Sequence, residues 1–310
     1  MSNPRRARVP ALAKINLDLR VLEKRADGFH ELRSLFHTIA LADSIEIAFT
    51  AARRTEIALD DPLAIADNLV TRAARAALDA MRLHGRVEMR LRKRIPMGAG
   101  LGGGSSDAAA VLLALPALAG RRLPLAKLSE LAAALGSDVP FFLLGGAAVG
   151  IGRGTELFPL PDLPAVAGLL LAPGVHVNTA AAYRALSPRL TTDLQRNKIY
   201  SFQSLTWEAR GLAKLANDFE EVVFEQHPEL AKLKRRLVRA GAFTSLMTGS
   251  GSAVFGLFRS REQAIRARED LKGTRSFPFT LVSRARYRAL WRRALAEHIE
   301  PATWPPQSRY

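Results

Sequence analysis

The chain has 310 residues, 48% of them hydrophobic, with 45 basic side chains, 29 acidic side chains and no cysteine. This length predicts one large or two medium-sized domains, and the lack of cysteine excludes disulfides and thiolate metal sites. The sequence shows neither a signal-peptide pattern nor an apolar run long enough for a membrane, so we expect a cytoplasmic protein. The net charge of +16 permits nucleic-acid binding. However, the basic residues are scattered, which favours a small anionic substrate and no nucleic acid.

The first predicted element is a strand over residues 13–21, where apolar residues alternate with polar ones. It is expected to be half-buried, with Lys14 and Asn16 side by side on its polar face. The elements expected next are a turn at 26–30, two strands within 35–49 that meet at 42–44, a helix from 67, a strand over 87–91 and a helix over 125–135.

A glycine-rich segment connects the strand over 87–91 to an apolar, helix-forming run. Its residues are Pro96, Met97, Gly98, Ala99, Gly100, Leu101, Gly102, Gly103, Gly104, Ser105 and Ser106. Glycines let backbone amides approach a ligand, and the start of a helix adds unpaired N–H groups, so this segment predicts a phosphate-binding loop. No lysine follows the glycines, which excludes a Walker A loop, and no second strand follows to support a dinucleotide fold. A purely structural turn is the alternative.

The second half of the chain shows a Pro-rich stretch at 158–164, where we expect a boundary between domains 1–160 and 161–310. The expected elements after this boundary are a strand over 166–172, helices over 180–186 and 216–240, strands over 242–247 and 253–258, a helix capped by Ser260, and a strand over 279–283. Strand-helix-strand-strand-helix-strand is the ferredoxin-like order. The tail from residue 294 contains three prolines and is expected to be loose.

Three segments together resemble the motifs of the GHMP small-molecule kinases. They are Lys14-x-Asn16 in the first strand, the glycine-rich segment, and Thr248-Gly-Ser-Gly251. The resemblance implies an α+β fold with a ribosomal-protein-S5-like N-terminal domain, a ferredoxin-like C-terminal domain and an active site in the cleft between them. Segments 13–17, 26–30, 101–106 and 137–141 are most similar to the members that phosphorylate a cytidine diphosphate-linked methylerythritol in isoprenoid precursor biosynthesis.

The resemblance also implies a phosphoryl transfer from ATP with Mg²⁺, in which the glycine-rich segment holds the triphosphate. Asp138 is then the base that accepts the hydroxyl proton, and Lys14 keeps that carboxylate ionised. Ser105 and Ser106 are expected to offer hydroxyls to phosphate or magnesium, without a dedicated carboxylate cage for the metal. The alternatives are that Asp138 only caps a helix at Pro140, and that Lys14 is a solvated strand residue.

On the acceptor side, the resemblance implies that Phe29 stacks on the cytosine, that His30 binds its polar edge and that Tyr183 is a second aromatic beside it. Further substrate contacts are expected from Asn16, Asn68, Thr179, Gly249, Ser250 and Gly251. Helix packing by Tyr183, helix capping by Asn68 and a packing turn at 249–251 are the alternatives. The role of Asp107, the choice between monomer and homodimer, and another GHMP kinase substrate (sugar, homoserine or mevalonate type) are left open. A nucleic-acid-binding protein on the same fold is the alternative from another class.

Overall fold

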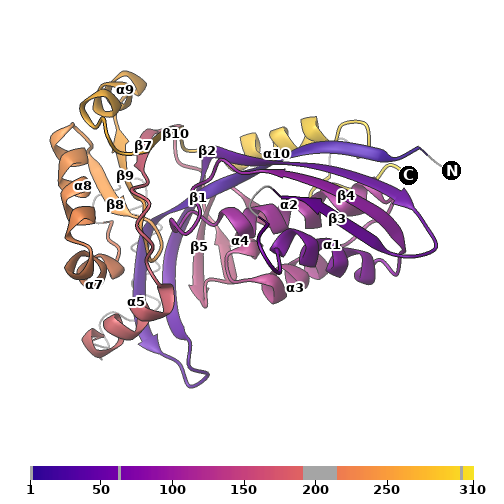
Figure 1. The fold of residues 1–310 in the computed structure, drawn as a ribbon, viewed down its shortest axis with the longest axis horizontal. Coiled ribbons are helices and arrows are strands. Elements are labelled where there is room, and N and C mark those ends of the chain that lie inside the picture. Colours follow the sequence, from indigo (N-terminus) through magenta and orange to yellow (C-terminus); the bar gives the residue numbers. More distant parts are fainter. Residues whose placement is uncertain (1–2, 62–63, 191–214, 301–302) are drawn as a thin grey trace.

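The computed structural model describes residues 3–61, 64–190, 215–300 and 303–310, which form two β-sheets with helices packed around them (Figure 1). In chain order the elements are β1 (Arg5–Lys24), β2 (His30–Ala51), β3 (Glu56–Asp60), α1 (Leu69–Ala80), β4 (Gly85–Arg92), α2 (Gly103–Leu118), α3 (Leu125–Leu135), α4 (Val139–Leu144), β5 (Ala147–Gly152), β6 (Glu156–Pro159), β7 (Ala167–Leu171), α5 (Thr179–Leu186), η1 (Ser187–Arg189), α7 (Phe219–Gln226), α8 (Pro228–Arg239), β8 (Thr244–Met247), β9 (Val254–Phe258), α9 (Arg261–Asp270), β10 (Ser276–Thr280) and α10 (Arg284–Ala294). No helix in these ranges is long and apolar enough to cross a membrane.

The large sheet is organised around β2, which pairs with β1 along most of its length and with β4 and β5 through its two halves. The prediction of two strands meeting at 42–44 was wrong, because β2 runs through this segment without a break. Asp43, the expected turn residue, is buried and accepts hydrogen bonds from the backbone N–H groups of Arg94 and Ile95. Asp43 therefore holds the residues directly before the glycine-rich segment.

The first hydrophobic core lies between the large sheet and helices α1 to α4, and it also contains the C-terminal helix α10. Tyr287 and Trp291 of α10 are among the largest fully buried side chains. The tail expected to be loose was predicted wrongly in its described part: Leu295 and Ile299 belong to this core, and Trp304 donates its indole N–H to the carbonyl oxygen of Leu143. Apolar residues before and between the prolines supply this packing.

The small sheet has the strand order β10-β7-β9-β8, and all of its pairs are antiparallel. This is the order of a ferredoxin-like domain, as the sequence predicted. The helix expected over 216–240 is instead two helices, α7 and α8, which meet at His227. Pro228 explains the break, because proline lacks an N–H group and fits the first turn of a helix.

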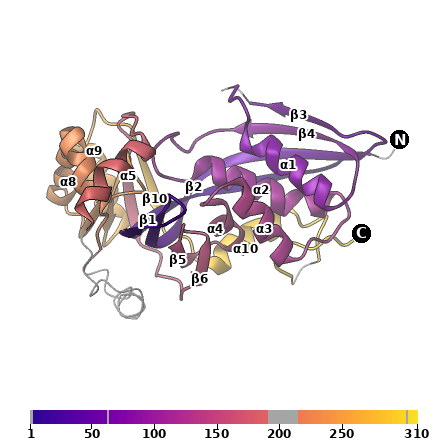
Figure 2. The same ribbon diagram turned by 90° about the horizontal axis from the view of Figure 1, so that it is seen from below.

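Both views place the small sheet with α8 and α9 at one end of the molecule and α1 with β3 and β4 at the other (Figures 1 and 2). Between the two sheets lies another apolar core, to which Ile15 and Leu17 of β1 and Phe255 and Phe279 of the small sheet contribute. This core fixes β1 against the C-terminal half of the chain, and β1 carries the first of the three motifs.

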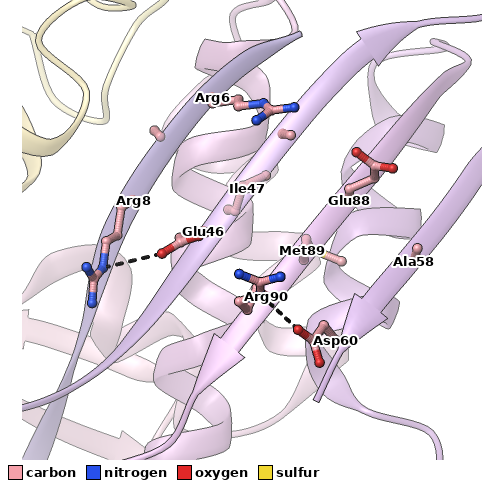
Figure 3. A pocket seen from close by; sticks show the side chains of 11 residues that line it. Arg6, Arg8, Glu46, Ile47, Ala58, Asp60, Glu88, Met89 and Arg90 are labelled. Atoms are coloured by element: carbon pink, nitrogen blue, oxygen red, sulfur yellow. Dashed lines mark hydrogen bonds and ion pairs between the residues drawn. The ribbon is translucent and has the colours of Figure 1, made fainter. Parts of the chain in front are cut away.

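The outer face of the large sheet carries charged side chains around a shallow hollow of about 630 Å³ (Figure 3). Exposed ion pairs cross it, between Arg8 and Glu46 at 3.9 Å and between Arg90 and Asp60 at 2.8 Å. None of its lining residues belongs to the cavities around the glycine-rich segment, so this face is separate from the candidate site.

Candidate active site

The glycine-rich segment connects β4 to α2, the strand-to-helix position that a phosphate site requires. Gly98, Gly100 and Gly102 have φ angles of 63°, 76° and 67°, a region that other residues rarely adopt. A side chain at Gly100 would also collide with the carbonyl oxygen of Thr248. Glycine at this position therefore allows the loop to lie directly against the Thr248-Gly-Ser-Gly segment.

Hydrogen bonds join the three motifs into one unit. The Thr248 hydroxyl accepts the backbone N–H of Asn16 at 3.1 Å and lies 3.2 Å from the carbonyl oxygen of Gly100. The backbone N–H of Lys14 donates to the carbonyl oxygen of Leu101 at 3.1 Å. Segments separated by more than 80 residues in the sequence are thus held in fixed register at the edge of a cavity.

Lys14 and Asp138 meet at this point. The Lys14 ammonium lies 3.4 Å from Asp138 Oδ2 and donates a hydrogen bond of 2.7 Å to Asn16 Oδ1. The Lys14 side chain is 4% exposed, whereas that of Asp138 is 35% exposed. The strand was expected to be half-buried, which is wrong for residues 11–19, because other segments cover both of its faces. Asp138 precedes α4 but makes no side-chain capping bond, so its carboxylate is directed to Lys14.

The acceptor cavity, of about 470 Å³, contains this pair and most of the predicted substrate residues. Its lining includes Lys14, Asn16, Gly98, Gly100, Gly102, Asp138, Arg153, His176, Thr179, Tyr183, Gly249, Ser250 and Gly251. The hydroxyls of Thr179 and Ser250 lie 2.8 Å apart, and this contact joins α5 to the Thr248-Gly-Ser-Gly segment. A small molecule that fills this cavity reaches the Asp138 carboxylate.

The aromatic residues are grouped at one side of the acceptor cavity. His30 stacks on Tyr183 with ring centres 4.8 Å apart, and its Nε2 lies 2.7 Å from the hydroxyl of Ser187. Burial, with a smaller effect of Lys24, lowers the pKa of His30. Phe29 is 48% exposed, and the guanidinium carbon of Arg153 lies 3.5 Å from its ring centre. Tyr183 and Arg153 line the cavity, whereas Phe29 and His30 are not among its lining residues but contact these two side chains.

A nucleotide-side cavity of about 380 Å³ lies on the other side of the glycine-rich segment and is lined by Pro96 to Ser105 of that segment, together with Ile65, Asp67, Asn68, Leu69, Leu91, Lys93, Ile95 and Asp107. Asn68, expected to bind the acceptor, lies here instead, where it caps α1 by accepting the N–H of Val70 and donates to Asp61. The Ser106 hydroxyl donates to the carbonyl oxygen of Leu12 at 2.7 Å, so it is directed into the protein. Ser105 is the serine that lines the cavity.

A buried charge cluster forms part of the wall of the nucleotide-side cavity, to which Lys93 and Asp107 contribute. The Lys93 ammonium is 2.7 Å from Asp107 Oδ2 and also contacts Asp43, and all three side chains are at most 10% exposed. Burial lowers the pKa of Lys93, but the two carboxylates outweigh burial and raise it. Burial and the negative charge of Asp43 raise the pKa of Asp107 to about 7, although Lys93 opposes this shift.

Two profiles of the GHMP kinases match the chain, the N-terminal domain over residues 68–146 and the C-terminal domain over residues 203–274. A 4-diphosphocytidyl-2-C-methyl-D-erythritol kinase of Solibacter usitatus is 68% identical to the chain, over 100% of the chain and 99% of that protein. A kinase of the same name from Geobacter sulfurreducens is 40% identical over 84% of the chain and 93% of that protein. The chain belongs to the 4-diphosphocytidyl-2-C-methyl-D-erythritol kinases of the GHMP family.

The solved structures agree with this family. A crystal structure of a 4-(cytidine 5'-diphospho)-2C-methyl-D-erythritol kinase matches with a TM-score of 0.76 and 41% identity, over 88% of the chain and 98% of its own. A homoserine kinase from Cytophaga hutchinsonii, 18% identical, matches with a TM-score of 0.70 over 91% of the chain and 96% of its own. The second match shows a common fold, and the predicted two-domain GHMP architecture is confirmed.

Sequence reasoning missed three residues at the site of this family member. Asn217 is buried and donates to the carbonyl oxygens of Met247 and Gly249, both at 2.8 Å, so it holds the Thr248-Gly-Ser-Gly segment. Asn217 comes directly before Asp218 and an acidic first helical turn, a pattern typical of a helix start. The expected helix over 216–240 ran through this position, so the signal was missed. Arg153 and His176 line the acceptor cavity, and their only sequence signal is a neighbouring glycine or proline.

Proposed function

We propose that this chain transfers the γ-phosphoryl group of ATP to the 2-hydroxyl group of 4-diphosphocytidyl-2-C-methyl-D-erythritol. The observation that carries the proposal is the Lys14–Asp138 pair, 3.4 Å apart, in a cavity bounded by the glycine-rich segment. A phosphoryl transfer needs the hydroxyl and the phosphate held together and little further covalent chemistry from the protein. We assign the reaction to the cytoplasm, where ATP is available.

In the proposed reaction, the acceptor oxygen bonds to the γ-phosphorus while the bond to the β,γ-bridging oxygen breaks, so ADP leaves. The hydroxyl proton goes to the Asp138 carboxylate, which is the carboxylate among the lining residues of the cavity. Lys14 lies beside this carboxylate and favours its charged form, and its ammonium offsets negative charge on the transferred group. Asn16 orients Lys14 through its 2.7 Å hydrogen bond.

We assign the triphosphate to the backbone N–H groups of the glycine-rich segment and the start of α2, with Ser105 as the hydroxyl contact. The glycines fit this role, because a side chain at Gly100 or Gly102 would meet neighbouring groups instead of leaving the loop open. Magnesium, when bound, supplies positive charge to the phosphate oxygens, and we place it on the nucleotide oxygens and water.

We assign the cytosine to the side of the acceptor cavity formed by Tyr183 and Arg153, next to Phe29 and His30. Tyr183 already stacks on His30, so the two rings form a stable platform at this side. Arg153 covers one face of Phe29, and a base stacks on the exposed remainder of that ring. Thr179 and the segment 249–251 are then placed at the diphosphate portion.

An assay of ADP release over a panel of alcohols tests the proposal. The panel contains the cytidyl substrate, mevalonate, homoserine and galactose, and each is measured with the wild-type chain and with Asp138→Asn. We expect turnover of the cytidyl substrate to exceed that of every other alcohol by at least a hundredfold, since a pocket with buried polar groups rejects molecules that leave them unpaired. Preferred turnover of another alcohol would identify a different GHMP kinase. Asp138→Asn controls for a contaminating ATPase, because it lowers the activity of the chain itself by about 10²- to 10⁴-fold and leaves a contaminant unaffected.

A further inference from the structure

A third cavity lies near the glycine-rich segment and belongs to neither the acceptor cavity nor the nucleotide-side cavity. This basic cavity has a volume of about 620 Å³, which is larger than the acceptor cavity at about 470 Å³. Five parts of the chain form it: the stem of the glycine-rich segment at 96–99, the loop at 172–174 after β7, one face of α8, Ser252 before β9, and the turn at 273–275 before β10. It is thus a built space between the two halves of the chain.

The charge of the basic cavity is strongly positive. Lys232 and Arg236 of α8 and Arg275 of the turn before β10 line it, and the acidic residue among its lining is Glu229. The Glu229 carboxylate lies 3.4 Å from the imidazole of His227, so it has a partner outside the three cations. A concave surface with three cations from two elements concentrates anions from solution.

The two cations that α8 contributes to the basic cavity lie close together on one helix face. Lys232 and Arg236 are separated by four residues, so they are neighbours on one helix face, and like charges at this spacing destabilise a helix. Neither makes an ion pair or a side-chain hydrogen bond with any part of the chain that the structure describes. The neighbouring Lys234, by contrast, is paired with Glu220. An anion bound between Lys232 and Arg236 removes this repulsion.

The geometry points to a site for a compound that carries a diphosphate or longer phosphate chain, distinct from the ATP site. A single carboxylate would neutralise only one of the three cations. Linked phosphates carry several negative charges and offer several acceptor oxygens to lysine and arginine, so they fit the cavity better. Pro96, Met97 and Ala99 line both the basic cavity and the nucleotide-side cavity. An occupant of the basic cavity therefore touches the stem of the loop that we assign to ATP, and it is positioned to change nucleotide affinity.

Calorimetric titration of inorganic pyrophosphate tests this site directly, without an activity readout. The chain is first saturated with a non-hydrolysable ATP analogue and Mg²⁺, which occupies the glycine-rich segment. We expect one saturable pyrophosphate site in the wild-type chain, with weaker binding of inorganic phosphate. The double variant Lys232→Glu/Arg236→Glu is expected to weaken pyrophosphate binding by at least about tenfold, because two charge-assisted hydrogen-bonding groups are lost.

The matched control is Arg235→Glu/Arg239→Glu, which changes the net charge of α8 by the same amount at exposed positions outside the cavity. It is expected to change pyrophosphate affinity less than about twofold, because exposed charges are screened by salt. Arg275→Gln, on a different element, weakens binding as well and keeps the test valid if the α8 double variant does not fold. The proposal is overturned if the saturated wild-type chain shows no saturable binding, or if both double variants lose affinity equally.

Discussion

The molecule contains two lysine–aspartate clusters beside the same glycine-rich segment, and they differ in how far their carboxylates are exposed to solvent. Lys93 is enclosed by two carboxylates, Asp43 and Asp107, and all three side chains are at most 10% exposed. Lys14 has one carboxylate partner at 3.4 Å, and that partner, Asp138, is 35% exposed in a cavity. The same residue types therefore form a closed cluster at the wall of the nucleotide-side cavity and an open pair in the acceptor cavity.

The difference indicates what each cluster can do. In the closed cluster, the Lys93 ammonium donates to two buried carboxylates, Asp43 of β2 and Asp107 of α2. The cluster therefore links β2 and α2 to the residues that follow β4. In the open pair, the Asp138 carboxylate oxygens remain accessible to a ligand, while Lys14 is positioned by its hydrogen bond to Asn16. We expect substitutions in the open pair to affect turnover and substitutions in the closed cluster to affect folding.

The largest effect is expected from Asp138→Asn. Loss of a general base lowers kcat by about 10²- to 10⁴-fold, while the free energy of unfolding is expected to fall by less than for the fully buried cluster, because the Asp138 side chain is 35% exposed. Steady-state kinetics and urea unfolding measure the two quantities, with Asp60→Asn on the outer sheet face as the control. A variant that retains more than about a tenth of wild-type kcat would show that Asp138 is not the base.

Lys93→Met is expected to have the opposite signature. It leaves Asp43 and Asp107 buried without their cation, and removal of one partner from a buried ion pair costs roughly 3–5 kcal/mol of unfolding free energy. Urea unfolding measures the loss, and the double variant Lys93→Met/Asp107→Asn is expected to recover part of it because one unpaired carboxylate is gone. An unfolding free energy equal to that of the wild-type chain would contradict the closed-cluster interpretation.

Asp107→Asn gives a smaller effect that depends on pH. The pKa of Asp107 is raised from 3.8 to about 7 in the folded chain, so the folded state binds more protons than the unfolded state between these values. Wild-type stability therefore falls as the pH rises through this window, and asparagine removes that fall. We expect the variant's Tm to match the wild-type value near pH 5 and to exceed it near pH 8. A Tm difference that is the same at both pH values would exclude this titration.

The smallest effect is expected from Asp60→Asn, which breaks the exposed pair with Arg90 on the outer sheet face. Exposed ion pairs contribute less than about 1 kcal/mol, because water and salt screen both charges. Urea unfolding at low and at high salt measures the contribution, which should shrink further at high salt. A loss as large as that of Lys93→Met would remove the distinction between buried and exposed clusters.

Local patterns in the sequence predicted those parts of the fold that depend on neighbouring residues. Strict alternation gave β4, whose residues are buried and exposed in turn, and the capping pattern at Ser260 gave the start of α9. The continuity of β2 was missed because it depends on pairing with β1, β4 and β5. Packing of the tail was missed for the same reason, since its partners lie in the first half of the chain.

The candidate site shows the same division. The glycine-rich segment was recognisable because its glycines and its position before a helix are local properties, and the resemblance added Lys14 and Asp138. The Lys93 cluster joins residues 50 positions apart, and no local pattern indicates that Asp43 faces Lys93. Ser106 could be named from its motif, but the direction of its hydroxyl to Leu12 depends on how α2 packs against β1.

The return of the C-terminal helix to the first core has a consequence for how the chain is made. Tyr287 and Trp291 belong to a core whose other members begin at Val9, so part of the apolar surface of the N-terminal half stays uncovered until α10 is in place. At the far ends, the guanidinium of Arg5 lies 3.9 Å from the ring centre of Tyr310, which joins the first strand to the last residue. The first core of this kinase therefore needs residues from both halves of the chain, and a chain shortened before residue 284 would leave it partly uncovered.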